Sequence, residues 1–173
     1  MAFDLQPILK GDLLELRPLR PDDFDDLYAV AADPLIWEQH PSKQRCQEEG
    51  FREFFAQGMG SGGALVAIDS QTGRIIGTSR FHCYDPEKNE IEIGWTFLAR
   101  AYWGRAYNRE MKALMLRHAF QFVERVFFLI DPLNFRSQKA IEKIGAIRAG
   151  WGDASGRRSF RYQIAASDFA RGR

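Results

Sequence analysis

Residues 102–110 have the sequence YWGRAYNRE, and this stretch indicates the fold more strongly than any other part of the chain. Its small residues, Gly104 and Ala106, stand between a predicted strand at 90–98 and a long predicted helix at about 105–123. The first turn of a helix directs several unpaired backbone N–H groups outward, with the positive end of the helix dipole behind them. When no large side chain blocks the approach, such a turn can hold a pyrophosphate.

Three arginines add positive charge around this turn, namely Arg100, Arg105 and Arg109. The spacing therefore predicts an anion site, although a glycine between a strand and a helix is more often an ordinary turn residue. Short glycine motifs need structural context to separate these two interpretations, so the rest of the sequence has to decide between them.

The composition is that of one globular domain spanning residues 1–173. Hydrophobic residues make up 45% and charged residues 27% of the chain, which is long enough to bury one full-sized core. The net charge of +1 gives no electrostatic reason to expect a nucleic acid or membrane partner. No apolar run is long enough to span a membrane, and residues 1–10 lack the apolar core of a signal peptide. We therefore expect a cytoplasmic protein.

The cysteines and histidines predict no metal site and no disulfide framework. With only two cysteines, Cys46 and Cys83, we expect both thiols to be reduced and Cys83 to be buried in a strand. His82 and Cys83 are sequence neighbours, so strand alternation would direct their side chains to opposite faces of a sheet. The three histidines do not combine with the cysteines at a metal-ligand spacing.

The hydrophobic pattern predicts an α+β domain in which helices cover both faces of one sheet. Seven strands are expected, at 13–19, 64–69, 74–83, 89–98, 126–130, 146–151 and 159–165. Four helices are expected, between 21 and 33, at 43–58, at about 105–123 and between 134 and 145. The continuously apolar run at 126–130 indicates a buried central strand.

The strand that precedes the 102–110 turn carries two carboxylates on one face, Glu90 and Glu92. Gly94 weakens this strand unless a β-bulge or a close ligand requires it, so it predicts one of the two. We expect Glu90 to lie on a solvated face of the sheet. Glu92 is nearer the glycine and can face a cleft, where burial would raise its pKa toward that of a useful general base.

A second helix start follows the predicted central strand. Residues 134–137, NFRS, place Asn134 where it can cap a helix and Ser137 in the first turn, and capping alone explains both residue types. However, this helix start and the 102–110 turn follow neighbouring strands at the same edge of the sheet. Two helix starts in this arrangement are typical of a ligand crevice.

In this combination and order, the motifs resemble those of the GNAT (Gcn5-related) N-acetyltransferases, and more narrowly the branch with the ribosomal-protein alanine acetyltransferases. The matching segments are EIGW at 92–95, YWGRAY at 102–107, NFRSQKAI at 134–141 with GA at 145–146, LELRPL at 14–19 and DPLIW at 33–37. The resemblance covers most of the chain. It implies a mixed, mostly antiparallel sheet of about seven strands, with about four helices and a V-shaped splay between strands 4 and 5.

The resemblance also implies that acetyl-CoA binds in this V as the co-substrate. Its pantetheine arm would pair with the backbone of Phe97 and Leu98, and Asn134 would hold the arm from the opposite side. The pyrophosphate would bind the backbone amides of the turn. The residues expected around the pyrophosphate are Trp103, Gly104, Arg105, Ala106, Tyr107 and Asn108.

The same resemblance implies the catalytic roles, with two departures from the family pattern. Glu92 would be the general base, directly or through a water, because a protonated amine must lose a proton before it attacks. Ile141 stands where many relatives have a tyrosine as general acid, and Ser137 has that role in the ribosomal branch. Ala101 stands where the family usually has Gln or Arg. Purely structural roles for Glu92 and Ser137 are the alternatives.

Aromatic residues of the first two helices and the final hairpin can line an acceptor pocket, although large aromatics at helical spacing are more often core residues. We expect only Trp37 to contact the acceptor. The aromatic residues expected in the core instead are His40, Phe51, Phe54, Phe55 and Trp151. No acidic cluster indicates a polyamine or aminoglycoside pocket.

The predicted reaction is therefore acetyl transfer from acetyl-CoA to a primary amine, by direct attack in a ternary complex. The acceptor would be a peptide or protein N-terminus or a small molecule, and the protein would be a monomer or a homodimer. Two other functions stay open at this point. The chain can be a non-catalytic or weakly catalytic acyl-CoA-binding module, which Ala101 and Ile141 favour, or an interaction protein of the same fold without a cofactor.

Overall fold

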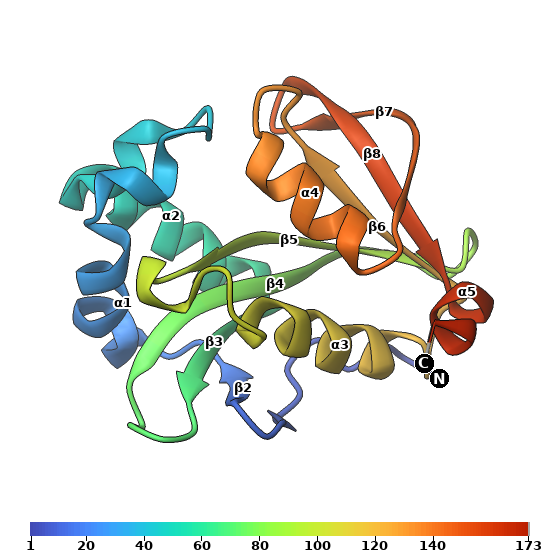
Figure 1. The fold of residues 1–173 in the computed structure, drawn as a ribbon, viewed down its shortest axis with the longest axis horizontal. Coiled ribbons are helices and arrows are strands. Elements are labelled where there is room, and N and C mark those ends of the chain that lie inside the picture. The colour runs from blue at the N-terminus through green and yellow to red at the C-terminus, as the bar shows by residue number, and fades with distance from the viewer. Residues whose placement is uncertain (173) are drawn as a thin grey trace.

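The computed structural model describes residues 1–172 and shows one mixed sheet with helices on both faces (Figure 1). The eight strands follow the spatial order β1-β2-β3-β4-β5-β6-β8-β7, and only β5 and β6 pair in parallel among the described residues. The strands are Leu9–Lys10 (β1), Leu14–Pro18 (β2), Ala64–Asp69 (β3), Ile75–Asp85 (β4), Glu90–Leu98 (β5), Arg125–Ile130 (β6), Ile147–Ala154 (β7) and Arg157–Ala165 (β8). The helices are Phe24–Ala31 (α1), Glu48–Ser61 (α2), Tyr107–Ala119 (α3), Phe135–Lys143 (α4) and Ala166–Arg171 (α5).

This architecture confirms the predicted α+β class and the mostly antiparallel sheet. The seven predicted strands correspond to β2–β8, and the four predicted helices to α1–α4. The sequence pattern did not predict β1 and α5, because two and six residues are too few to establish a period. The helix predicted at 43–58 begins later than expected: Lys43–Cys46 forms a 3-10 turn, extended Gln47 interrupts the chain, and α2 follows.

Two apolar clusters hold the helices against opposite faces of the sheet. On one face, Met111 and Met115 of α3 and Ile141 of α4 join the main core. In Figure 1, α3 and α4 lie over this face on either side of the β5 ribbon. On the other face, Leu27 of α1 and Phe51 of α2 belong to a second cluster. The predicted core positions of Phe51, Phe54 and Phe55 are confirmed, since these residues are at most 8% exposed.

The central feature of the sheet is that β5 and β6 stay together for only three residue pairs. Glu90, Ile91 and Glu92 pair with residues 125–127. Beyond these pairs, β5 continues to Leu98 and β6 to Ile130 without pairing with each other. The splay predicted between the fourth and fifth long strands is therefore confirmed. It leaves the C-terminal half of β5 with β4 as its only partner strand among the described residues.

A β-bulge in β5 coincides with the start of this splay. Arg80 of β4 lies opposite Gly94, but Thr78 lies opposite Phe97, so β5 holds one residue more than β4 between these pairs. Trp95 has a φ of +53°, a value that is uncommon for a residue with a side chain. The bulge was predicted at Gly94, and the residue with the left-handed conformation is the next one.

Two further predictions about β4 and β5 were wrong. Glu90 is not on a solvated face: it is 6% exposed, and its carboxylate pairs with Arg161 at 2.7 Å and Arg125 at 3.3 Å. Cys83 is exposed rather than buried, because its φ of +51° and a register shift between His82 and Asp85 disturb the strand alternation there.

Trp151 was also expected in the core, and the structure places it on the surface. It is 46% exposed on β7, the edge strand of the sheet. Its ring packs against Phe160 of β8, with ring centroids 4.7 Å apart, and Arg158 lies over it at 4.0 Å. The alternating pattern that predicted the strand does not distinguish a covered face from an open one when the strand is at an edge.

Among residues 1–172, none of the helices is both long and apolar enough to cross a membrane. Within the same residues, no group of three or more His, Cys, Asp or Glu side chains is arranged to hold a metal ion.

One carboxylate ties the start of α3 to the edge of the sheet. Glu110 accepts hydrogen bonds from the backbone N–H groups of Asp12, Leu13 and Leu14, at 2.9, 2.8 and 3.0 Å. These N–H groups belong to the turn before β2 and to its first residue. Glu110 thereby fixes the first turns of α3, although the sequence pattern offered no reason to single it out.

We expect Glu110→Ala to destabilise the fold by about 2–4 kcal/mol, because three N–H groups, two of them in partly buried hydrogen bonds, lose a charged acceptor. Urea unfolding followed by circular dichroism measures this loss. Glu110→Gln keeps one acceptor oxygen and should fall between Glu110→Ala and the wild type. A change below about 0.5 kcal/mol for Glu110→Ala would show that the anchor contributes nothing.

Candidate active site

The turn between β5 and α3 has the free donors that an anion site requires. Among residues 1–172, no acceptor is found for the backbone N–H groups of residues 104–109. Ala106 stands at the N-cap position of α3, where its methyl side chain supplies no cap. Gly104 has a φ of +69°, which favours glycine and makes the sharp turn possible. The turn therefore presents a row of unpaired backbone donors at the start of α3.

Two tyrosines hold this turn in place. The hydroxyls of Tyr102 and Tyr107 both donate to the carboxylate of Asp69 on β3, at 3.2 and 3.1 Å. Asp69 is 2% exposed, and Tyr107 is 3% exposed. Arg105 lies over both tyrosine rings. The Tyr107 side chain therefore serves as an anchor in the core, and only its backbone amide can face a ligand.

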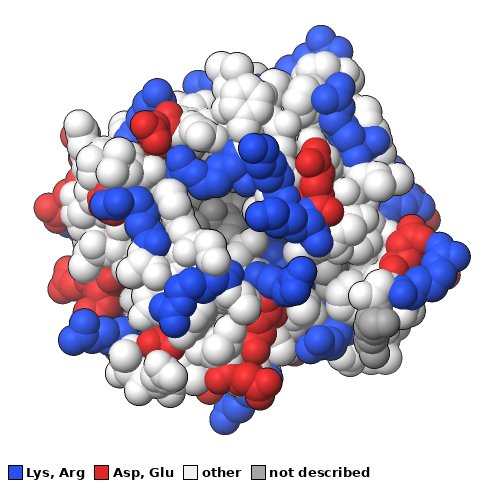
Figure 2. All heavy atoms as spheres, in the orientation of Figure 1, with Lys and Arg blue, Asp and Glu red and all other residues white. Residues whose placement is uncertain are grey.

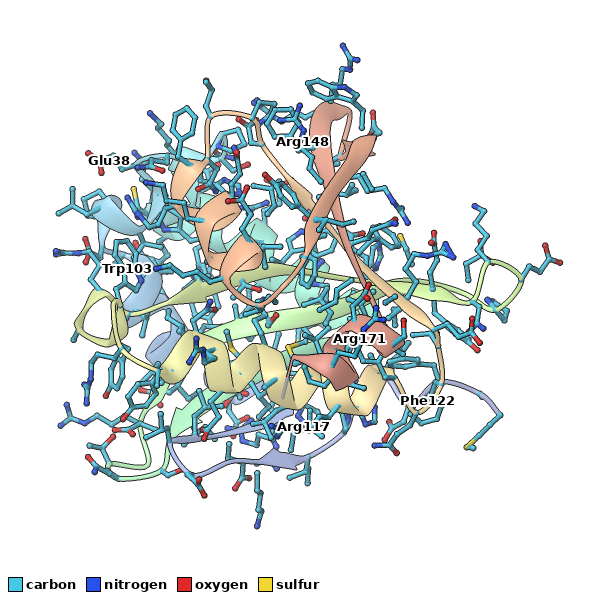
Figure 3. All side chains as sticks on the ribbon, turned by 45° about the vertical axis from the view of Figure 1, so that its right-hand side comes forward. Glu38, Trp103, Arg117, Phe122, Arg148 and Arg171 are labelled. Atoms are coloured by element: carbon cyan, nitrogen blue, oxygen red, sulfur yellow. The ribbon has the colours of Figure 1, made fainter. Side chains whose placement is uncertain are left out.

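Trp103 joins the turn to the splayed end of β5 and to the second helix start. Its Nε1 donates to the carbonyl oxygen of Leu98 at 2.9 Å. On its other side, the guanidinium carbon of Arg136 lies 4.2 Å from the Trp103 ring centroid. Arg136, in the first turn of α4, also pairs with Glu38 at 3.5 Å. Figure 3 labels Trp103 and Glu38, which lie on the same side of the molecule. The two helix starts thus face each other across the splay, as predicted.

The capping role of Asn134 is confirmed. Its side-chain Oδ1 accepts from the backbone N–H of Ser137 at 3.3 Å, which places Asn134 at the N-cap of α4. Ser137 is half-buried, and no described residue hydrogen-bonds to its hydroxyl. Ile141 is 5% exposed in the main core, so the usual tyrosine position holds no proton donor.

Positive charge surrounds the entrance to the splay. Figure 2 shows Lys and Arg side chains gathered around a hollow on the face that carries α3 and α4. Arg105 and Arg136 are the arginines whose contacts with Trp103 and the tyrosines place them at the two helix starts. Such a rim attracts a multiply charged anion toward the unpaired amides.

Glu92 is buried at the point where β5 leaves β6. The residue is 5% exposed, and this burial raises the pKa of its carboxyl to about 7. Opposing effects come from the Cys83 thiol, which hydrogen-bonds to the carboxylate, and from the charges of Arg80 and Arg161. A Cβ atom at Gly94 would lie 3.4 Å from Glu92 Oε1, so the glycine keeps space open beside the carboxylate. A carboxyl group with such a pKa can accept a proton near neutral pH.

Trp37 does not occupy the position predicted for it. It is 3% exposed in the core under α1 and α2, and its Nε1 donates to the carbonyl oxygen of Ala31 at 2.8 Å. Its ring packs against Phe97, with centroids 5.2 Å apart. Because its one polar atom is paired and its surface is covered, Trp37 supports the wall of the site and does not present a face to an acceptor.

Residues 14–147 match the protein-family model described as the acetyltransferase (GNAT) domain. This match covers both helix starts, the splayed strands and Glu92. The chain belongs to the GNAT acetyltransferase family.

Solved structures support the GNAT fold. A GNAT-family acetyltransferase from Bacillus anthracis superposes with a TM-score of 0.75 at 23% identity, covering 92% of this chain and 98% of that one. Spermidine N-acetyltransferase from Vibrio cholerae, in complex with CoA and spermine, gives 0.70 at 16% identity, covering 92% and 99%. Mycobacterium smegmatis RimJ, in complex with CoA-disulfide, gives 0.67 at 17% identity, covering 93% and 87%. A search of the curated proteins found no match.

The GNAT motifs did not predict Lys112, which the structure places beside the bulge. This lysine of α3 is 3% exposed, and its Nζ approaches the hydroxyls of Thr96 at 2.5 Å and Ser79 at 3.5 Å. No carboxylate within residues 1–172 pairs with it, and burial lowers its pKa to about 7. The helical period does indicate that Lys112 is buried, since it precedes buried Met115 and Leu116 by three and four residues and so lies on the same face of α3.

We expect Lys112→Met to be more stable than the wild type at pH 6, because the wild type must bury an ammonium ion there. The folded pKa, about 7, lies below the ordinary 10.5, so the unfolded chain binds more protons between these values. Wild-type stability should therefore rise with pH across this window, by at most about 1.4 kcal/mol per pH unit.

Urea unfolding of both proteins at pH 6 and pH 9 measures the difference between their pH dependences. Lys139→Met, at an exposed lysine of α4, is the matched control and should follow the wild-type profile. Parallel profiles for Lys112→Met and the wild type would contradict the lowered pKa of Lys112.

Proposed function

We propose that this GNAT acetyltransferase transfers the acetyl group of acetyl-CoA to a primary amine by direct attack within a ternary complex. The observation that carries the proposal is the row of unpaired N–H groups at 104–109, which lies beside a splayed strand pair. A pyrophosphate accepts several such donors at once, and the positive end of α3 adds to the attraction. Two of the structurally similar proteins were solved with CoA or a CoA disulfide, which supports a CoA ligand here.

The residues of the splay fit the other parts of the co-substrate. The pantetheine arm would lie along the unpaired end of β5 at Phe97 and Leu98, with Asn134 on the opposite side of the cleft. Leu98 already shares its carbonyl oxygen with the Trp103 indole. A pantetheine amide donating to Leu98 would therefore bind next to Trp103 or displace it. The pyrophosphate would take the amides between Gly104 and Asn108.

The chemistry requires one proton to leave the amine and one to reach the sulfur. Glu92 would accept the proton from the attacking amine, directly or through a water, and its pKa of about 7 suits that task. The nitrogen then forms a bond to the thioester carbon, and the carbon–sulfur bond breaks. Ser137 would donate a proton toward the leaving thiolate, and its hydroxyl is free of other described partners. Because Ser is a weak acid, positioning of the two substrates would contribute most of the rate.

An acyl-CoA-binding module with little or no turnover is the second candidate function. The specific observation in its favour is the burial of Ile141, which leaves no acid at the position that many GNAT enzymes use. Ala101, exposed before the turn, likewise lacks the usual polar side chain. Thiol release from acetyl-CoA across a panel of amines separates the two functions, since a binding module would bind acetyl-CoA and release no thiol with any amine.

For Glu92→Gln we expect kcat to fall at least tenfold, with the Kd for acetyl-CoA nearly unchanged, because Gln cannot accept the proton. The wild-type rate should rise with pH through about 7, as Glu92 loses its proton, and the variant should lack this rise. Steady-state kinetics between pH 5.5 and 9 and calorimetry with acetyl-CoA measure both effects. An unchanged rate would remove Glu92 from the mechanism.

Ser137→Ala tests the proposed acid in the same assay. If Ser137 protonates the thiolate, kcat should fall about 10–100-fold, while the free energy of unfolding changes by less than 1 kcal/mol. The stability should hold because Asn134 caps α4 through the backbone N–H of residue 137, which the substitution keeps. Full activity of the variant would leave Ser137 as an ordinary first-turn residue.

A further inference from the structure

A second group of buried charges lies on the face of the sheet that carries α1 and α2. Its centre is Arg80 of β4, which is 4% exposed. The guanidinium carbon lies 4.4 Å from the ring centroid of Trp95, the bulge residue. Arg80 Nε is buried and has no hydrogen-bond partner, and no described carboxylate forms an ion pair with this side chain. Arg80 is therefore a buried cation without a counterion.

Arg45 brings a second cation to the same place. It belongs to the 3-10 turn Lys43–Cys46 that precedes α2, and it is half-buried. The guanidinium carbons of Arg45 and Arg80 lie 4.7 and 5.8 Å from the centroid of the same ring, that of Phe54. Arg45 also forms no ion pair with any residue described by the structure. Two arginines thus converge on one aromatic ring, and neither forms an ion pair with a described acid.

The groups that face these arginines do not neutralise them. Glu92 attracts Arg80 and Glu53 attracts Arg45, but neither acid comes within ion-pairing distance. Burial and the charge of Arg45 lower the pKa of His40 to about 4, so this histidine is neutral. Burial also lowers the pKa of each arginine to about 10, which leaves both charged at neutral pH. Buried charges without partners are costly, and a ligand anion would remove that cost.

The space beside Arg45 is small. A hollow of about 170 Å³ lies between α2 and the β7–β8 turn, with Arg45, Glu53, Phe54 and Ser155 in its lining. Arg80 is not part of this lining, although its guanidinium carbon approaches the Phe54 ring. Pockets for drug-sized ligands usually enclose roughly 300–1,000 Å³. The hollow therefore fits a small acceptor or the end of a larger one.

We propose that Arg80 and Arg45 form a carboxylate subsite, so that the acceptor is a small amine that also carries a carboxylate, as free amino acids do. This inference rests on the proposed function, because it assigns the acceptor of the same reaction. The planar guanidinium of an arginine binds a carboxylate through two parallel hydrogen bonds. Both arginines have N–H donors without a described acceptor. The same pair of cations would repel a polyamine, which gives the site a basis for discrimination.

The sheet register places this subsite next to the proposed base. Arg80 lies opposite Gly94 and His82 lies opposite Glu92, so Arg80 and Glu92 are diagonal neighbours on one face of β4 and β5. Diagonal neighbours in an antiparallel pair are about 7–8 Å apart. An acceptor held by Arg80 must therefore have its amine only a few bonds from its carboxylate, which favours α- and β-amino acids.

The test compares each L-amino acid with its carboxamide, which keeps the amine and removes the negative charge. Calorimetry in the presence of CoA measures binding, and thiol release from acetyl-CoA measures turnover. At least one acid should bind ten times more tightly than its amide, and the acid should have the higher kcat/KM. If no amino acid binds at least ten times more tightly than its carboxamide, the proposal of a carboxylate subsite is wrong.

Arg80→Gln and Arg80→Lys identify the residue responsible. The Gln variant should lower the ratio of acid to amide affinity at least tenfold, and Lys should restore part of it, since it keeps the charge and loses the fork. Arg45 lies nearer the surface than Arg80. Arg45→Gln therefore gives a second test of the acid-to-amide ratio if Arg80→Gln does not fold. Arg52→Gln, on an exposed face of α2 over the Phe24 ring, is the control and should leave the ratio unchanged.

The two readouts keep the inference separate from the proposed reaction. Tight binding of acids without thiol release would overturn the acetyl transfer and retain the subsite. Turnover of amides or peptides at the same rate as acids would retain the transfer and overturn the subsite. A loss of acid and amide binding in equal proportion in Arg80→Gln would show that Arg80 only supports the fold, and this would also overturn the subsite.

Discussion

The parting of β5 from β6 is the constraint on which the rest of the structure depends. The strands share three residue pairs and then diverge, and the bulge at Trp95 turns the end of β5 away from β6. Divergence leaves backbone groups of β5 without a neighbouring strand, a condition that a sheet avoids unless something else covers that edge. The helices that follow the two strands, α3 and α4, begin on either side of this opening (Figure 1).

Three buried charged side chains lie close to the bulge, on the two faces of the sheet. Glu92 and Arg80 lie on the face that carries α1 and α2, and Lys112 reaches the bulge from α3 on the opposite face. All three are at most 5% exposed, and none has an opposite charge within ion-pairing distance among the described residues. Perturbed groups of this kind concentrate at functional sites, since a protein gains little stability from them. The GNAT motifs identified Glu92 alone, while the folded chain shows the other two.

Much of the fold was predictable because the deciding signals are local. The turn at 102–110, the helical period of α3 and the N-cap at Asn134 each depend on residues close in sequence, and each was confirmed. The errors concern tertiary context. Alternation placed Glu90 correctly on a face with Glu92, but it did not reveal that Arg125 and Arg161 would cover that face. Trp37 was expected to contact the acceptor and is buried, whereas Trp151 was expected in the core and is exposed. The reason is the same for both, because their burial depends on which elements pack against them. The Arg80 and Arg45 pair joins segments that only the folded sheet brings together.

We propose above that the unpaired amides beside the splay hold the pyrophosphate of acetyl-CoA. An NMR titration of ¹⁵N-labelled protein with acetyl-CoA tests it most directly, because each amide reports its own hydrogen bond. We expect saturable downfield shifts of the amide protons of residues 104–108, with further changes at Phe97 and Leu98. Saturable binding that leaves those amides unmoved and perturbs another surface would contradict it.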